Sequence, residues 1–208
     1  LLSIRADQSK PEASSLRGFA LDVVNRLIAM KDNKGELIGL PTGVQELDTS
    51  TTGIREGELW IVGALPGRGK TALGIQIAAE NAKRGTTVCF FSLEMSRDQL
   101  YLRLLAGESH VKASKIRNPH YLNDTDLQYI NQAASDTFEW PLFIDDASSL
   151  TTNEIIARSK LYIRRFGVKL IIVDYLRLIE SPGKEIRERG ANAANALRQV
   201  AKDENVPV

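Results

Sequence analysis

A glycine-bearing loop between two regular segments constrains the fold of this chain more than any other feature of its sequence. The loop covers residues 64–71 and reads Ala-Leu-Pro-Gly-Arg-Gly-Lys-Thr. An apolar run at 59–63 precedes it and predicts a strand, and an amphipathic stretch at 72–83 follows it and predicts a helix. Strand, glycine loop and helix in this order are typical of a phosphate-binding loop. We therefore expect an α/β domain that binds a nucleotide.

The residue types in this loop suit a bound polyphosphate. Backbone N–H groups can surround the phosphate oxygens, and the positive end of the following helix adds to the attraction. We expect Lys70 to reach the β- and γ-phosphates and the Thr71 hydroxyl to bind Mg²⁺. Ala64 stands where the strict pattern has glycine, but two glycines remain for close backbone approach. The loop residues expected to contact the nucleotide are Ala64, Pro66, Gly67, Arg68, Gly69, Lys70 and Thr71.

Apolar runs alternate with amphipathic segments in the rest of the chain. Further strands are expected at residues 87–92, 142–145 and 169–174, and helices at 71–84, 97–107, 126–135, 152–166 and 191–203. Ser96 with Gln99 and Thr151 with Glu154 have the spacing of a capping box at a helix start. This alternation predicts a mostly parallel central sheet flanked by helices. Residues 206–208 read as the start of another strand, which would make the sequence a fragment.

Several acidic residues end apolar strands. Asp174 follows Leu-Ile-Ile-Val, and Glu94 follows the strand expected at 87–92. Parallel strands present their carboxyl ends at one edge, so both acids are expected beside the phosphate loop, with Asp174 on Mg²⁺. Glu94 can orient and deprotonate the attacking water, although its position also suits a solvated acid at a helix start. Asp145 and Asp146 could join this edge, but we favour exposed acids at a turn.

These motifs together resemble the motor domain of DnaB-type replicative helicases, within the RecA-like P-loop ATPases. The resemblance runs from about residue 39 to the end and includes Gly-Leu-Pro-Thr-Gly at 39–43 and Pro-Leu-Phe-Ile-Asp-Asp at 141–146. Its most specific parts are Phe-Ser-Leu-Glu-Met-Ser at 91–96 and Val-Asp-Tyr-Leu at 173–176. It implies a ring-shaped homo-hexamer that hydrolyses ATP, or another nucleoside triphosphate, with Mg²⁺ at subunit interfaces. Such a motor moves along single-stranded DNA and unwinds duplex.

The resemblance also implies roles for individual residues. It makes Glu94 the general base and assigns Lys70, Thr71 and Asp174 to the phosphates and the metal ion. The charged segment 177–190 would then face DNA, as a loop. Its cations are the candidate phosphate contacts, and a solvated loop of mixed charge is the alternative, because glutamates lie among them. These candidate cations are Lys184, Arg187 and Arg189. Arg177 stands where the family often has glutamine, and no residue here maps to an arginine finger or a sensor.

The chain is expected to divide near residue 38. Residues 1–38 would form a polar tail and a linker helix, and residues 39–208 the ATPase domain. Three-four spacing of apolar residues predicts the helix at 16–30. From the residues alone, this helix packs on its own domain or docks on a neighbouring subunit; the resemblance implies docking. It further implies a helicase loader and a primase as partners, in the cytoplasm of a bacterium or as a phage-encoded protein.

Composition limits the other functions. The net charge of +1 gives no global attraction to nucleic acid, so DNA would be bound by a local surface. Cys89, the only cysteine, lies in an apolar run and is expected in the core, and no stretch approaches the roughly 20 apolar residues of a membrane span. Two alternatives stay open: another RecA-like ATPase of recombination, repair or regulation, and a nucleotide-binding scaffold or loader paralogue without hydrolysis. The intact Glu94 and Asp174 argue against the second.

Overall fold

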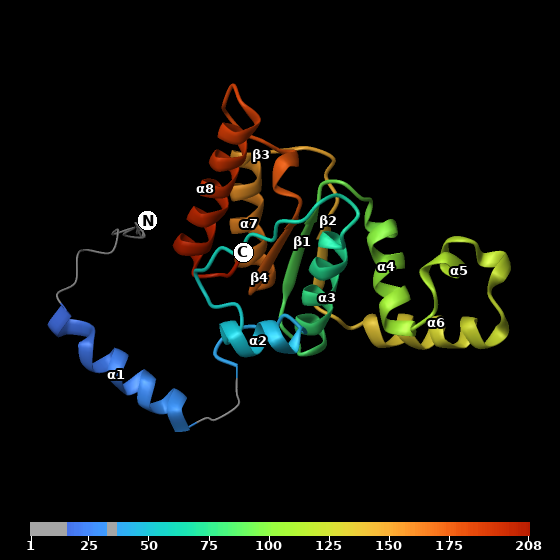
Figure 1. The fold of residues 1–208 in the computed structure, drawn as a ribbon, viewed down its shortest axis with the longest axis horizontal. Helices are drawn as coiled ribbons and strands as arrows, with labels where there is room; N and C mark the ends of the chain where they lie inside the picture. Colours follow the sequence, from blue (N-terminus) through green and yellow to red (C-terminus); the bar gives the residue numbers. More distant parts are fainter. Residues whose placement is uncertain (1–15, 33–36) are drawn as a thin grey trace, which may run out of the picture. The chain divides into compact units, whose positions relative to one another are not determined.

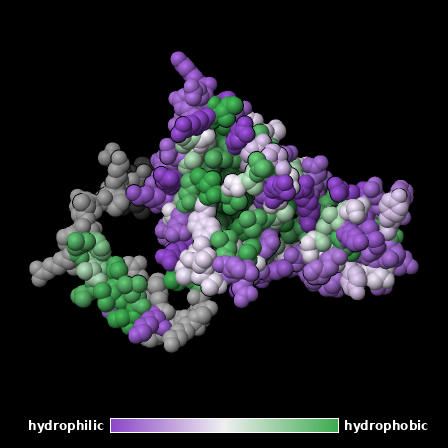
Figure 2. Space-filling view, viewed as in Figure 1, coloured by the Kyte–Doolittle hydropathy of each residue, from purple (hydrophilic) through white to green (hydrophobic). Residues whose placement is uncertain are grey.

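The computed structural model of the protein describes residues 16–32 and 37–208. The chain forms two compact units, Leu1–Glu36 and Leu37–Val208. In the first unit, α1 (Leu16–Asp32) confirms the helix expected at 16–30. Figure 2 shows that apolar side chains gather on α1. Among the described residues, no helix combines the length and the apolar character that crossing a membrane requires.

A parallel sheet of three strands forms the centre of the second unit. Its order is β2 (Leu142–Asp145), β1 (Val88–Ser92), β4 (Leu170–Asp174), so β1 lies in the middle. All residues of β1 are buried, as expected for an apolar strand covered on both faces. The register sets Ser92 opposite Asp174. The carboxyl ends of the three strands therefore meet at one edge, as the sequence predicts.

Successive side chains of β1 point to opposite faces of the sheet, and a different pair of helices covers each face. The four helices beside the sheet are α3 (Lys70–Lys83), α4 (Arg97–Ser109), α7 (Thr152–Phe166) and α8 (Ile186–Glu204). Phe91 belongs to a core cluster with residues of α7 and α8. Phe90 belongs to a second cluster with residues of α3 and α4. Figure 1 shows the resulting layers, with α7 and α8 on one side of the strands and α3 and α4 on the other.

After α4 the chain forms an arm, which extends away from the sheet (Figure 1) and consists of α5 (Ala113–Arg117), η1 (Pro119–Tyr121) and α6 (Asp124–Thr137). α6 begins earlier than the 126–135 we expected, because Asn123 and Asp126 form a capping box. The expected capping boxes at the starts of α4 and α7 are confirmed. The short α5 and η1 were not expected, since too few residues are present for a periodic pattern.

The remaining elements are small. They are α2 (Gln45–Thr51), the parallel pair of β3 (Leu150–Thr151) and β5 (Ile179–Glu180), and η2 (Leu176–Leu178). The helix α2 precedes the segment that leads to the phosphate loop. η2 and β5 directly follow β4 and turn the chain toward α8.

The strand expected at 59–63 is not formed, which corrects the sequence prediction. The Trp60 N–H donates to the Val208 carbonyl at 2.8 Å, and the Val208 N–H donates to the Glu58 carbonyl at 2.9 Å. On the other side, the Ile171 N–H donates to the Pro207 carbonyl at 3.0 Å. Residues 206–208 therefore lie between β4 and residues 58–60. Two backbone bonds do not make a continuous ladder, so the apolar run before the phosphate loop is extended but unpaired beyond Trp60 among the described residues.

The charged segment 177–190 is also more regular than the loop we expected. It contains parts of η2 and β5, and α8 begins at Ile186 rather than at 191. Gly190 disfavours an earlier helix start, but one glycine costs a helix only about 1 kcal/mol. Burial of Ala193 and Leu197 on the sheet outweighs that cost. The end of the segment is thus the first turn of a helix.

Candidate active site

The phosphate loop leads directly into α3, and two glycines set its shape. Gly67 and Gly69 have φ angles of 73° and 89°, in the left-handed region that favours glycine. A Cβ atom at either position would meet no atom within 4 Å, so backbone conformation rather than space demands glycine. No side chain caps the start of α3 at Gly69. The first amides of this helix can therefore donate to a bound anion.

Thr71 and Asp174 meet across the cleft between α3 and the sheet. The Thr71 hydroxyl donates to Asp174 Oδ2 at 2.7 Å, although the two residues are 103 positions apart. Asp174 ends β4 and is only 6% exposed. A hydroxyl and a carboxylate oxygen side by side are the hard oxygen donors that Mg²⁺ prefers. The chemistry of this pair therefore fits the metal site expected from the sequence.

Lys70 lies where the phosphate loop and the end of β4 come together. Its Nζ is 3.5 Å from the Ala64 carbonyl oxygen and 5.1 Å from the centroid of the Tyr175 ring. The ammonium group thus bonds the start of the loop and lies over an aromatic face, which attracts a cation. The sequence analysis gave Tyr175 no role, although this residue belongs to the Val-Asp-Tyr-Leu stretch that carries part of the resemblance. The ring holds the head of Lys70 within the cleft.

Glu94 lies on a short arch, residues 92–97, that joins β1 to α4. The Leu93 N–H donates to the Asp174 carbonyl at 2.9 Å, and the Ser92 hydroxyl donates to the Met95 carbonyl at 2.7 Å. Glu94 itself is exposed. It lines the same broad, open cleft as Lys70, Thr71 and Asp174. The bond from Leu93 to the Asp174 carbonyl sets the arch beside the strand end that carries Asp174, and Asp174 in turn binds Thr71.

The two other acids at this edge are not the exposed turn residues that we favoured, because arginines from α7 and α4 pair with them. The Asp145 side chain is 8% exposed and the Asp146 side chain 22%. Both Asp145 oxygens accept from Arg158 Nη1, at 3.0 and 2.9 Å, and Oδ2 accepts from the Tyr162 hydroxyl at 2.8 Å. Burial, and then the bond to Asp145, raise the pKa of Tyr162. Asp146 binds Arg97, and this hydrogen bond holds the pKa of Asp146 below its ordinary value. Neither acid lines the cleft.

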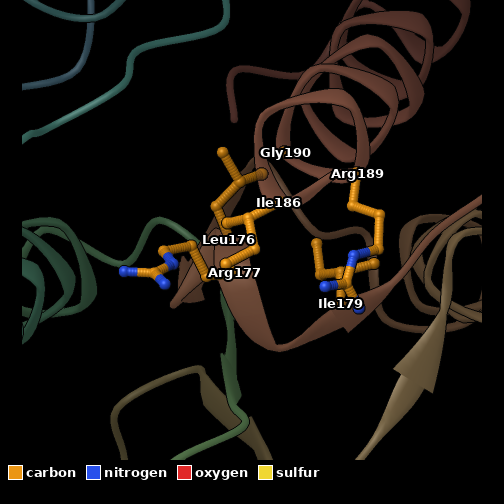
Figure 3. Close-up of a pocket in the computed structure, with 6 residues that line it drawn as sticks. All are labelled: Leu176, Arg177, Ile179, Ile186, Arg189 and Gly190. Carbon is orange, nitrogen blue, oxygen red and sulfur yellow. The ribbon is translucent and has the colours of Figure 1, made fainter. Parts of the chain in front are cut away.

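The candidate DNA-contacting cations are exposed but do not share one surface. Lys184 stays in a loop, while Arg187 and Arg189 lie two positions apart in the first turn of α8 and so point to different sides. Arg189 lines a pocket of about 150 Å³ together with Arg177 and apolar residues. Figure 3 shows the two arginines on opposite sides of this pocket. Arg177 also lines the broad cleft.

Comparison with known proteins places this arrangement in a family. Residues 39–208 match the model of the DnaB-like helicase C-terminal domain. The chain is 35% identical over 212 residues to the replicative DNA helicase DnaB of Leifsonia xyli, covering all of this chain and 46% of that protein. It is 32% identical over 198 residues to the DnaB of Geobacillus stearothermophilus, covering 93% of this chain and 43% of the relative.

A solved structure shows the same fold. A DnaB-like replicative helicase, solved in work on its interactions with primase, superposes with a TM-score of 0.82 at 24% identity. The superposition covers 97% of this chain and 48% of the other. The chain also spans about half the length of the curated relatives it matches.

Proposed function

Because this chain belongs to the DnaB-like helicase C-terminal domain family, we propose that it is the ATP-hydrolysing motor of a replicative DNA helicase. The observation that carries the proposal is the bond between Thr71 and Asp174 at the head of the phosphate loop, with Glu94 on the same cleft. The geometry supports the proposal because a hydroxyl–carboxylate pair, a glycine-bearing loop at a helix start and an exposed carboxylate line one cleft. Hydrolysis of a nucleoside triphosphate uses groups of these three kinds.

In the proposed mechanism each residue acts on one part of the substrate. The amides of the loop and of the α3 start bind the phosphates of ATP, and Lys70 leaves the Tyr175 ring to reach the β- and γ-phosphates. Thr71 and Asp174 would hold Mg²⁺, which would neutralise negative charge on the substrate phosphates. Glu94, exposed on the arch, orients the attacking water and accepts its proton.

The proposal extends to assembly and partners. We place the chain in a homo-hexamer that translocates on single-stranded DNA, with Lys184, Arg187 and Arg189 as phosphate contacts. α1 supports a docking role because several of its apolar side chains are exposed, among them Leu16, Leu21, Leu27 and Ile28. We propose that this helix, expected at residues 16–30, docks on a neighbouring subunit. A primase is a proposed partner, since a solved DnaB-like relative interacts with primase. A helicase loader is proposed as a second partner from the resemblance to DnaB-type helicases alone. The cytoplasm of a bacterium or of a phage-infected cell is the proposed location.

Replacing the proposed base tests the mechanism. In the full-length protein, Glu94→Gln should keep ATP affinity and lower ATP turnover by about 100-fold or more, because the amide cannot accept the proton. Phosphate release measures turnover, with and without single-stranded DNA, and a fluorescent ATP analogue measures affinity. Glu139→Gln is the matched control, because Glu139 is an exposed acid beyond the arm that does not line the cleft. Turnover at the wild-type rate in Glu94→Gln would remove Glu94 from the mechanism.

The assembly role of α1 has its own test. Deleting residues 1–32 should abolish the hexamer at a concentration where the full-length protein assembles, while the melting temperature of the ATPase domain stays unchanged. Deleting residues 1–15 alone is the control and should leave assembly intact. Sedimentation velocity reports the assembly state. Persistence of the hexamer without α1 would show that the helix has another role.

A further inference from the structure

The arch that carries Glu94 is held from both neighbouring strands. On the β4 side, the Leu93 N–H donates to the Asp174 carbonyl at 2.9 Å. On the β2 side, the Arg97 N–H donates to Asp146 Oδ2 at 3.0 Å, across 49 positions. Glu94 is exposed between these two anchors. The conformation of the arch therefore depends on both strands that flank β1.

Asp146 makes more than one bond to its side of the arch. The Arg97 guanidinium donates to Asp146 Oδ1 through Nη2 at 2.9 Å and through Nε at 3.3 Å. Together with the backbone bond, both carboxylate oxygens of Asp146 accept hydrogen bonds from Arg97. Arg97 is the first residue of α4, and its N–H is one of the amides that a helix start leaves without an internal partner. Asp146 thus fixes the point where the arch becomes a helix.

The segment that carries Asp146 is itself held in place by α7. Asp145, the neighbour of Asp146, ends β2 and binds Arg158 and Tyr162 of α7. The Ala147 N–H donates back to Asp145 Oδ1 at 3.2 Å. The backbone on either side of Asp146 is therefore tied to α7 by one carboxylate. A contiguous set of bonds runs from α7 through the two acids to the arch.

We propose that Asp146 is a positioning residue for hydrolysis, which acts through Arg97 to hold the arch and its Glu94 in the geometry that attack by water requires. The inference rests on the proposed function, because it needs Glu94 to be the base. Asp146 does not line the cleft, so it does not touch substrate. Loss of its bonds frees one end of the arch, and a displacement of about 1 Å at a catalytic group costs about 100-fold in rate.

The test is a graded series in the full-length protein. Asp146→Ala removes all three bonds and should lower kcat for ATP by about 10- to 100-fold while KM changes by less than about twofold. Arg97→Ala keeps the backbone N–H bond and should lose less. Asp98→Asn, an exposed acid in the same first turn of α4, is the control and should keep wild-type kcat. Equal kcat in Asp146→Ala and the control would overturn the proposal.

A second comparison separates positioning from a loss of folding. In the Glu94→Gln background, adding Asp146→Ala should leave the residual turnover unchanged, because the group being positioned is already gone. A further fall by the same factor as in the wild type would show that Asp146 acts independently of Glu94, and the proposal would fail. If Glu94→Gln itself keeps wild-type turnover, Glu94 is not the base and the positioning proposal fails with it. If the wild-type protein does not hydrolyse ATP with or without single-stranded DNA, the proposed function fails instead. Fluorescent ATP-analogue binding, unchanged in Asp146→Ala, verifies that the phosphate loop is intact.

Discussion

The acid next to the proposed positioning residue gives a sharp test of what stabilises the fold. Asp145 lies at the end of β2 with its side chain 8% exposed, and it accepts hydrogen bonds from Arg158 and Tyr162. Asp145→Ala removes the acceptor and leaves the guanidinium and the phenol to find water. Both donors come from α7, so the change loosens this helix from the sheet.

The expected cost follows from the exposure of the two partners. A hydrogen bond involving a charged group contributes about 1.5–3 kcal/mol, which we apply to the bond from Tyr162. The Arg158 side chain is 38% exposed and can rehydrate, so its ion pair is discounted to about 1 kcal/mol. The sum predicts a loss of about 2.5–4 kcal/mol in the free energy of unfolding. For a domain of this size, the melting temperature should fall by about 5–16 °C.

Urea unfolding followed by tryptophan fluorescence measures this loss. Asp136→Ala is the matched control, because Asp136 bonds only Gln132 on the exposed face of α6 and should cost less than about 0.5 kcal/mol. A double-mutant cycle with Tyr162→Phe should give a coupling energy of about 1 kcal/mol or more. A loss below about 1 kcal/mol in Asp145→Ala, or a cycle without coupling, would refute the reasoning that this carboxylate ties α7 to β2.

Two further outcomes are expected from single groups. Cys89 is fully buried in β1, and burial raises its pKa to about 12. Iodoacetamide at pH 8 should therefore not alkylate this thiol until the protein is unfolded. Rapid alkylation of the folded protein would contradict the place of Cys89 in the core. Bonds from the Thr151 N–H and hydroxyl lower the pKa of Glu154, so its stabilisation is full above the unfolded pKa and is lost as the pH falls through the lowered folded pKa. Glu154→Gln should weaken the dependence of the unfolding free energy on pH in that range, and an unchanged acid transition would exclude this group as a cause.

Features set by neighbouring residues were predicted well from the sequence. The phosphate loop, the buried strand β4 and the capping box of α7 each depend on a stretch of fewer than about ten residues, in which the pattern and the local chemistry agree. Cys89 was placed in the core because its neighbours are apolar, and the structure confirms this. The meeting of Thr71 and Asp174 followed from a topological rule, that parallel strands share an edge, and needed no contact information.

Features set by distant partners were not predictable. The bond between Arg97 and Asp146 joins residues that no local spacing relates, and the arginine by itself is an ordinary surface cation. The run at 59–63 is apolar enough for a strand, but strand formation depends on a continuous neighbouring ladder, which the sequence does not display. The sequence did not predict the start of α8 at Ile186, because Gly190 has a low helix propensity. Packing on the sheet outweighs that propensity, and packing cannot be read from the sequence.

The central position of β1 has a consequence for how the length of this chain can vary. One added residue in β1 would shift Glu94 by about 3.3 Å along the strand and turn every following side chain to the opposite face. It would also uncouple Ser92 from Asp174. The arm, in contrast, packs on α4 and contributes no residue to a strand, so insertions there leave the register of the sheet untouched. A viable sequence of this fold can gain or lose residues between α5 and α6. The number of residues from Val88 to Glu94 cannot change, because Glu94 must stay beside Asp174 for the proposed hydrolysis.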